Sequence, residues 1–173
     1  MKPAAAFPGR HRARPRTGGR ALVAGALALL VLSAAAVVAV PWWRDAAIAA
    51  QAGAAAADLR RFVEAFKQHA HDRGDWPPAA APAAIPAGMN AALPADRWSQ
   101  ATPIGGHYTW ARESLQRGTR LQAAIVITGS GPAPVSIDRR VLTEIDRLID
   151  DANLDTGRFR LGFRLQPVMV LEF

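Results

Sequence analysis

Residues 21–40, ALVAGALALLVLSAAAVVAV, form an apolar stretch without a charged side chain. A helix of this length is about 30 Å long, which matches the hydrocarbon core of a bilayer. Only basic charges precede the stretch, and they are Lys2, Arg10, Arg12, Arg14, Arg16 and Arg20. Because Lys and Arg are enriched on the cytoplasmic side of membrane spans, the pattern predicts one transmembrane helix over residues 20–41. The N-terminus is then cytoplasmic and the rest of the chain lies outside the cytoplasm.

A cleavable secretory signal is the alternative interpretation of the same segment. The apolar region of a signal is usually about 7–15 residues long and is followed closely by a small-residue cleavage site. Here the apolar run is longer and ends in Pro41, Trp42, Trp43 and Arg44, which favours an anchor. The two tryptophans suit the outer membrane interface. The other interpretation places them in the core of the domain that follows.

The net charge of +7 comes almost entirely from the N-terminal segment, because residues 21–173 carry 15 basic and 14 acidic side chains. Because the basic residues adjoin the predicted span, we attribute them to the orientation of the span in the membrane and to contact with lipid headgroups. Nucleic-acid binding is not predicted. The chain has no cysteine, which excludes disulfides, thiol catalysis and cysteine-ligated metals. The residues beyond the span suffice for one domain and not for two.

The next segment, residues 45–71, is rich in good helix formers and predicts an amphipathic helix that continues the span. Its apolar residues recur at helical spacing and predict packing on a sheet; they are Leu59, Phe62, Val63, Phe66 and Ala70. Asp58 and Arg61 form a three-residue pair that predicts a solvated face. Gly74 is placed to end the helix, and the prolines after it prevent its return.

Beyond a loop over residues 74–103, residues 106–112 and 121–128 predict two strands of a hairpin, with a turn at Arg117 and Gly118. A second, short helix is predicted to follow Ser136 or Asp138, either of which can act as its cap. The apolar stripe of this helix consists of Ile137, Val141, Ile145, Leu148 and Ile149.

The C-terminal residues 158–166 alternate apolar and polar side chains, which predicts a half-buried strand. Residues 168–171 add a last apolar segment. Whether Pro167 interrupts one long strand or separates two strands is open. Trp76, Trp98 and Trp110 are predicted to be core aromatics, with an interface role as the alternative.

One register near the N-terminus and three segments farther along carry a family resemblance. If Gly19 ends a leader and Arg20 begins the mature chain, Pro41 falls twenty-one residues after the first mature residue. Residues 74–77 and 102–110 form two of the segments. The third, residues 145–160, follows the pattern ID..IDDGNL.TG.FR, with Ala152 in place of glycine. In this order the chain resembles type IV pilins and the pseudopilins of type II secretion systems.

The resemblance implies an α+β, pilin-like fold. Its long N-terminal helix, membrane-spanning in the first half, packs on a small antiparallel sheet, and one short helix is added. The implied plan is a basic cytoplasmic leader over residues 1–19, a transmembrane helix over 20–41 and a pilin-like domain over 42–173. The helix runs to about residue 73, and the strands and short helix occupy residues 104–173. The implied location is the bacterial inner membrane, single-pass, with the domain in the periplasm.

The function implied is that of a structural subunit of a type II secretion or type IV pilus machine. Its partners are other pilin-like subunits, inner-membrane assembly proteins and lipid, and prepilin peptidase is expected to cut between Gly19 and Arg20. The family usually has phenylalanine as the first mature residue and glutamate four residues later, where this chain has Arg20 and Ala24. That departure favours a minor or atypical subunit. The alternative is a single-pass envelope protein whose outer domain binds a ligand or partner without polymerising.

An acidic loop is the one candidate for a metal site. Asp150, Asp151, Asn153 and Asp155 place oxygen ligands at alternating positions, a spacing that calcium favours. The alternative is a polar turn whose side chains bond their own backbone. No catalytic constellation is present, so neither an enzyme activity nor a cofactor other than calcium is predicted.

Overall fold

The computed structural model describes the backbone of residues 18–173, with the side chains of residues 25, 27, 29, 30, 33 and 41–173. Within this range lie three α-helices and a four-stranded antiparallel sheet. The chain divides into two units, Met1–Trp43 and Arg44–Phe173. Helix α1 (Gly18–Arg73) contributes to both units and contains Pro41.

The prediction of a membrane-spanning first half of the long helix is wrong for the part of the chain that the structure describes. No helix there is both long and apolar enough to cross a membrane, which also removes the support for a single-pass, inner-membrane location. From Pro41 onward, charged side chains recur along α1; they are Arg44, Asp45, Asp58, Arg60, Arg61, Glu64, Lys67, Asp72 and Arg73. Each such charge opposes insertion into hydrocarbon. Most side chains of residues 20–40, and all of residues 1–17, lie outside the described residues.

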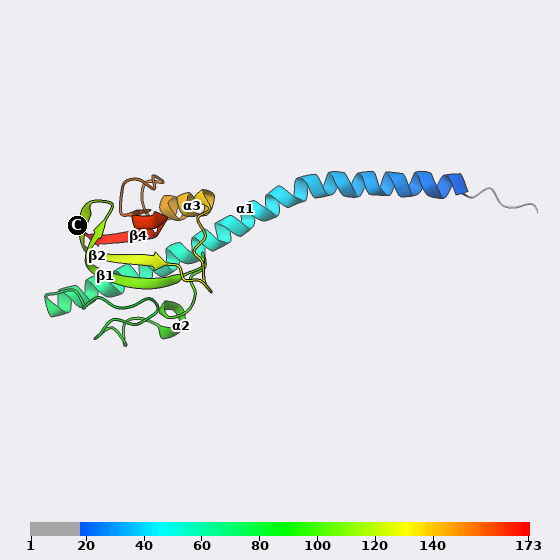
Figure 1. Cartoon of the computed structure of the whole chain (residues 1–173). Helices are drawn as coiled ribbons and strands as arrows, with labels where there is room; N and C mark the ends of the chain where they lie inside the picture. Colours follow the sequence, from blue (N-terminus) through cyan, green and yellow to red (C-terminus); the bar gives the residue numbers. More distant parts are fainter. Residues whose placement is uncertain (1–17) are drawn as a thin grey trace, which may run out of the picture. The chain divides into compact units, whose positions relative to one another are not determined.

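In the second unit, α1 packs one face against the sheet (Figure 1). The buried side chains of this face recur at helical spacing; they are Ala52, Ala55, Ala56, Leu59, Phe62, Val63 and Phe66. The helix ends as predicted, because Gly74 takes a φ of 74° and its N–H donates to the Ala70 carbonyl at 2.8 Å. Glycine adopts this left-handed conformation without the steric cost of a Cβ.

The sheet has the strand order β1-β2-β4-β3. Strands β1 (His107–Gln116) and β2 (Thr119–Thr128) form the predicted hairpin. Arg117 and Gly118 take φ values of 44° and 84°, and two consecutive positive φ angles suit the twist of a two-residue hairpin turn.

Strand β4 (Pro167–Glu172) lies antiparallel to β2 and also to β3 (Phe159–Leu161). Pro167 therefore begins a strand. The strand predicted over residues 158–166 is therefore too long, because only Phe159–Leu161 pairs with β4. Residues Phe163–Leu165 form a single 3₁₀ turn in which the side chains of Phe163 and Leu165 are exposed.

The loop between α1 and β1 contains a helix that the sequence did not predict, α2 (Ala95–Trp98). It carries Trp98 into an aromatic cluster, consisting of Phe62, Phe66, Trp98, Tyr108 and Trp110, that joins α1, α2 and β1. Trp98 and Trp110 are fully buried, as the core interpretation predicted.

Asp58 does not lie on a solvated face of α1, contrary to prediction. Its side chain is buried and accepts from the Arg97 guanidinium at 2.7 Å and from the Tyr108 hydroxyl at 3.4 Å. Burial, followed by the negative charge of Asp58, raises the pKa of Tyr108, which therefore stays a hydrogen-bond donor. This bond network ties α2 and β1 to α1.

Helix α3 (Arg139–Ile149) covers the same core. Of the two predicted caps, Asp138 is the N-cap, because its side chain accepts from the Arg140 N–H at 2.9 Å. Val141, Leu142 and Ile145 are buried in the core that α1 and the sheet share. The last turn of α3 is also tied to α1, since the Arg60 guanidinium donates to the carbonyl of residue 148.

Candidate functional site

One acidic residue of α3 points into the protein interior. Asp146 lies one turn after the buried Leu142 and next to the buried Ile145, so the helical repeat places it on the apolar face. Its side chain is 0% exposed, and neither carboxylate oxygen has a hydrogen-bond partner. A buried polar group normally has a partner, because losing water without replacement costs about 1–3 kcal/mol or more. The burial of the Asp146 carboxylate without a hydrogen-bond partner is therefore unusual.

Two further carboxylates lie beside it and complete what we call the acidic cluster: Asp146, Asp150 and Asp151. One oxygen from each of the three lies within 4.8 Å of the others. Asp150 ends α3, where the backbone leaves helical geometry, and both Asp150 and Asp151 are exposed to solvent. Asp146 is therefore the buried member of the cluster, and Asp150 and Asp151 are its solvent-exposed members.

The loop of residues 150–157 folds back over this cluster. Asp151 accepts from the Asn153 N–H at 3.0 Å and from the Thr156 hydroxyl at 3.0 Å. Asp150 accepts from the backbone N–H of Arg158. Gly157 has a φ of 72°, and a Cβ there would lie 2.1 Å from an Asp150 carboxylate oxygen. The close turn around the carboxylates therefore requires glycine.

The charges of the cluster oppose one another. Burial, and then the negative charges of Asp151 and Asp150, raise the pKa of Asp146 to about 6, and the nearby backbone N–H of Asn153 opposes this rise. Among the described residues, no Lys, Arg or His side chain forms an ion pair with any of the three carboxylates. A proton or a bound cation would relieve this repulsion.

The four predicted metal ligands separate into two groups. Asp150 and Asp151 join the acidic cluster. Asn153 accepts from the Asp155 N–H at 3.2 Å, as in a polar turn, and Asp155 lies 3.6 Å from Arg117. The sequence did not single out Asp146. A signal was available, however, since an aspartate one turn after Leu142 interrupts the apolar stripe of α3.

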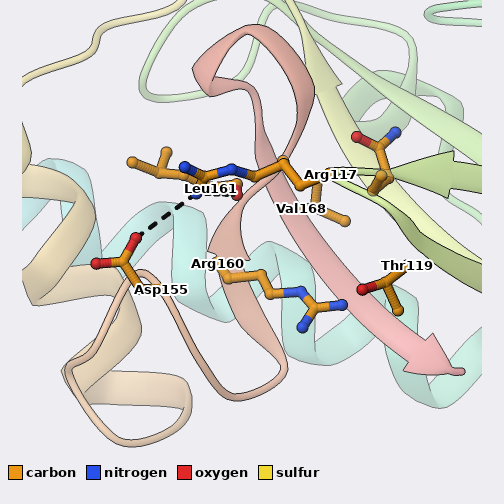
Figure 2. Close-up of a pocket in the computed structure, with 8 residues that line it drawn as sticks. Arg117, Thr119, Asp155, Arg160, Leu161 and Val168 are labelled. Atoms are coloured by element: carbon orange, nitrogen blue, oxygen red, sulfur yellow. Dashed lines mark hydrogen bonds and ion pairs between the residues drawn. The ribbon is translucent and has the colours of Figure 1, made fainter.

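A pocket of about 320 Å³ lies beside the loop, at the end of the sheet, and is shown in Figure 2. Arg117 reaches toward Asp155, while the Arg160 side chain extends toward Thr119. The Arg160 guanidinium lies 4.9 Å from the ring centre of Phe173, and its buried Nη2 has no hydrogen-bond partner. Two guanidinium groups and one carboxylate give the pocket an excess of positive charge suited to a carboxylate or other anion.

The predicted processing residues, Gly19 and Arg20, lie on the helical backbone of α1, with their side chains outside the described residues. The predicted cut between them stays a prediction. Trp76 is half-buried and packs against Trp110 with ring centres 5.7 Å apart. No protein-family model and no curated protein matches the sequence.

Proposed function

We propose that this protein is a structural, pilin-like subunit that assembles with other pilin-like subunits. The observation that carries the proposal is a set of uncovered apolar side chains on the first part of α1. Leu27, Leu29 and Leu30 are 62%, 68% and 71% exposed. Several large apolar side chains exposed within a short segment mark a place that partners cover.

The uncovered side chains do not share one face of the helix. At about 100° per residue, Leu29 points about 200° away from Leu27, and Leu30 points about 100° away from Leu29. A helix that docks on a single surface has one apolar stripe. Apolar side chains on several sides instead favour a segment surrounded by several neighbours, as in a bundle of helices from different subunits.

Two further features support a pilin-like subunit. In the second unit, α1 packs its apolar face on an antiparallel sheet through the aromatic cluster. If Gly19 ends a leader, Pro41 also falls at the position where the mature helix of a pilin commonly has a proline. Because Ala24 stands where the family usually has glutamate, we assign the chain to the minor or atypical subunits of a type II secretion or type IV pilus machine. Prepilin peptidase is then its processing enzyme.

Cysteine crosslinking in the native cells tests the assembly. The chain has no cysteine, so a Leu30→Cys substitution gives one attachment site for a maleimide–benzophenone reagent. The photoactivated benzophenone inserts into C–H bonds of any neighbouring protein, so illumination is expected to yield adducts with a second copy or with other pilin-like subunits. Arg139→Cys, on an exposed residue at the start of α3, is the matched control and should stay mostly monomeric. A monomer alone for Leu30→Cys, or equal adducts for both variants, would contradict assembly through α1.

A further inference from the structure

We propose that the pocket shown in Figure 2 binds one carboxylate group, with the guanidinium of Arg160 as its main partner. The inference does not depend on the proposed function. Ligand pockets in proteins usually measure about 300–1,000 Å³, and this one measures about 320 Å³. Its volume therefore suits a small organic acid or a single acidic side chain.

The pocket lies between the tip of the β1–β2 hairpin and the segment that follows β3. Gln116 Oε1 accepts from the Phe163 N–H at 2.8 Å, which joins the two segments. The Arg117 guanidinium also donates to the Leu161 carbonyl at 3.3 Å. Leu161 and Val168 are buried and form apolar parts of the lining. The pocket is thus formed before a ligand arrives, which reduces the entropy lost on binding.

Arg160 lines this pocket without a counterion. It is half-buried, and no ion pair of the described residues includes it. Its enclosed Nη2 also lacks a hydrogen-bond partner, while the guanidinium lies over the ring of Phe173. Charged groups withdrawn from water are normally paired. A carboxylate supplies the missing charge, and its bonds with arginine are among the stronger hydrogen bonds in proteins.

The charges of the lining favour a carboxylate over a phosphate. Arg117 and Arg160 contribute two positive charges and Asp155 one negative charge, which leaves an excess of one positive charge. A carboxylate balances that excess. A phosphate monoester carries about −1.5 to −2 at pH 7 and would bring surplus negative charge close to Asp155. Thr119 adds a neutral hydroxyl donor to the lining.

Titration of the isotope-labelled, full-length protein with sodium isobutyrate at constant ionic strength, followed by amide chemical shifts, tests the site. Saturable shifts are expected at the lining residues Thr119 and Gly162. Arg160→Gln should weaken binding by at least about tenfold, because it removes charge-assisted hydrogen bonds. Arg164→Gln is the matched control and should keep the wild-type affinity, since it removes the same charge from an exposed residue outside the pocket.

Two further variants test the charge balance within the pocket. Arg117→Gln, at the exposed hairpin turn, should also weaken binding, which keeps the test valid if Arg160→Gln does not fold. Asp155→Asn should strengthen binding by up to about fivefold, because it removes the ion pair at 3.6 Å that competes for Arg117. The assignment would be overturned by an absence of saturable shifts, by equal losses for Arg160→Gln and Arg164→Gln, or by tighter binding of phosphate than of isobutyrate.

A small acid and an Asp or Glu side chain of another chain present the same carboxylate, and two measurements on material from the native cells separate these sources. If the carboxylate belongs to a partner, a maleimide–benzophenone reagent on Arg120→Cys, an exposed position beside Thr119, yields a protein adduct that Arg160→Gln abolishes. If it belongs to a small molecule, native mass spectrometry shows the added mass of an acid that Arg160→Gln removes. The lack of both results would overturn carboxylate binding in the cell. The Leu30→Cys crosslinking tests assembly through α1 separately.

Discussion

Replacing Trp110 by alanine is expected to lower the free energy of unfolding by about 3–5 kcal/mol, the usual range for deleting a buried aromatic side chain. The Trp110 side chain is fully buried and stacks on Phe66 with ring centres 3.8 Å apart and planes 9° apart. Its indole N–H also donates to the Pro77 carbonyl at 2.9 Å, so the substitution leaves a buried acceptor unpaired. Since the free energy of unfolding of a domain is typically only about 5–15 kcal/mol, this loss removes a large part of the protein's stability.

Urea denaturation of the full-length protein, followed by circular dichroism, measures the effect. Trp43→Ala is the matched control, because the Trp43 side chain is 69% exposed. We expect that substitution to change stability by less than about 0.5 kcal/mol. Equal effects of the two substitutions would contradict the position of Trp110 at the contact between α1 and the sheet.

The stability of the protein is expected to fall as the pH rises from about 4 to about 6, through the titration of Asp146. The folded-state pKa of about 6 lies above the ordinary value of 3.8, so the folded protein binds more protons than the unfolded chain in this window. Stability then declines with rising pH, and the loss is complete above the folded-state pKa. At 1.36 kcal/mol per pKa unit, it amounts to about 3 kcal/mol at most.

The comparison of wild type with Asp146→Asn isolates this contribution. Other carboxylates titrate in the same range, and some act oppositely. The pKa of Glu144 is lowered by its hydrogen bond with Arg147, for example. Those effects are common to both proteins. The variant should lack the decline due to Asp146 and be the more stable protein at pH 7. Parallel stability curves for the two proteins would show that Asp146 is not buried beside the other two carboxylates.

The local elements of the domain could be predicted from the sequence because their signals are local. The turn at Arg117 and Gly118, the helix cap at Asp138 and the helix end at Gly74 each depend on the conformational preferences of one or two residues. The structure has each where the pattern indicated it. The hairpin strands were placed correctly but drawn too short, and β1 extends to Gln116.

Signals that depend on distant parts of the chain led to errors. Alternation over residues 158–166 predicted one strand, but Gly162, followed by positive φ angles at Arg164 and Leu165, turns the chain so that β4 can pair with β3. Asp58 looked solvated because its partner Arg97 is 39 residues away. In both cases tertiary pairing decided the outcome.

The acidic cluster could be predicted only in part, because the burial of one of its members also depends on tertiary structure. The alternating oxygens of the loop were visible in the sequence, and they pointed to Asp150 and Asp151. The third carboxylate, Asp146, belongs to the helix before the loop, and only folding shows that it is enclosed and without a partner. Asp155 has the right spacing, but its carboxylate lies beside Arg117. Spacing identified the loop, and burial identified the third carboxylate of the cluster.

The intact mass and N-terminal sequence of the protein isolated from its native cells test the proposed pilin-like identity most directly. Pilin-like subunits lose a leader that ends in glycine, so the account predicts a mature chain that begins at Arg20, with the methyl group that prepilin processing adds to the new N-terminus. A chain that still begins at or near Met1 would contradict processing as a pilin-like subunit. It would favour a protein whose folded domain binds a ligand or partner without polymerising.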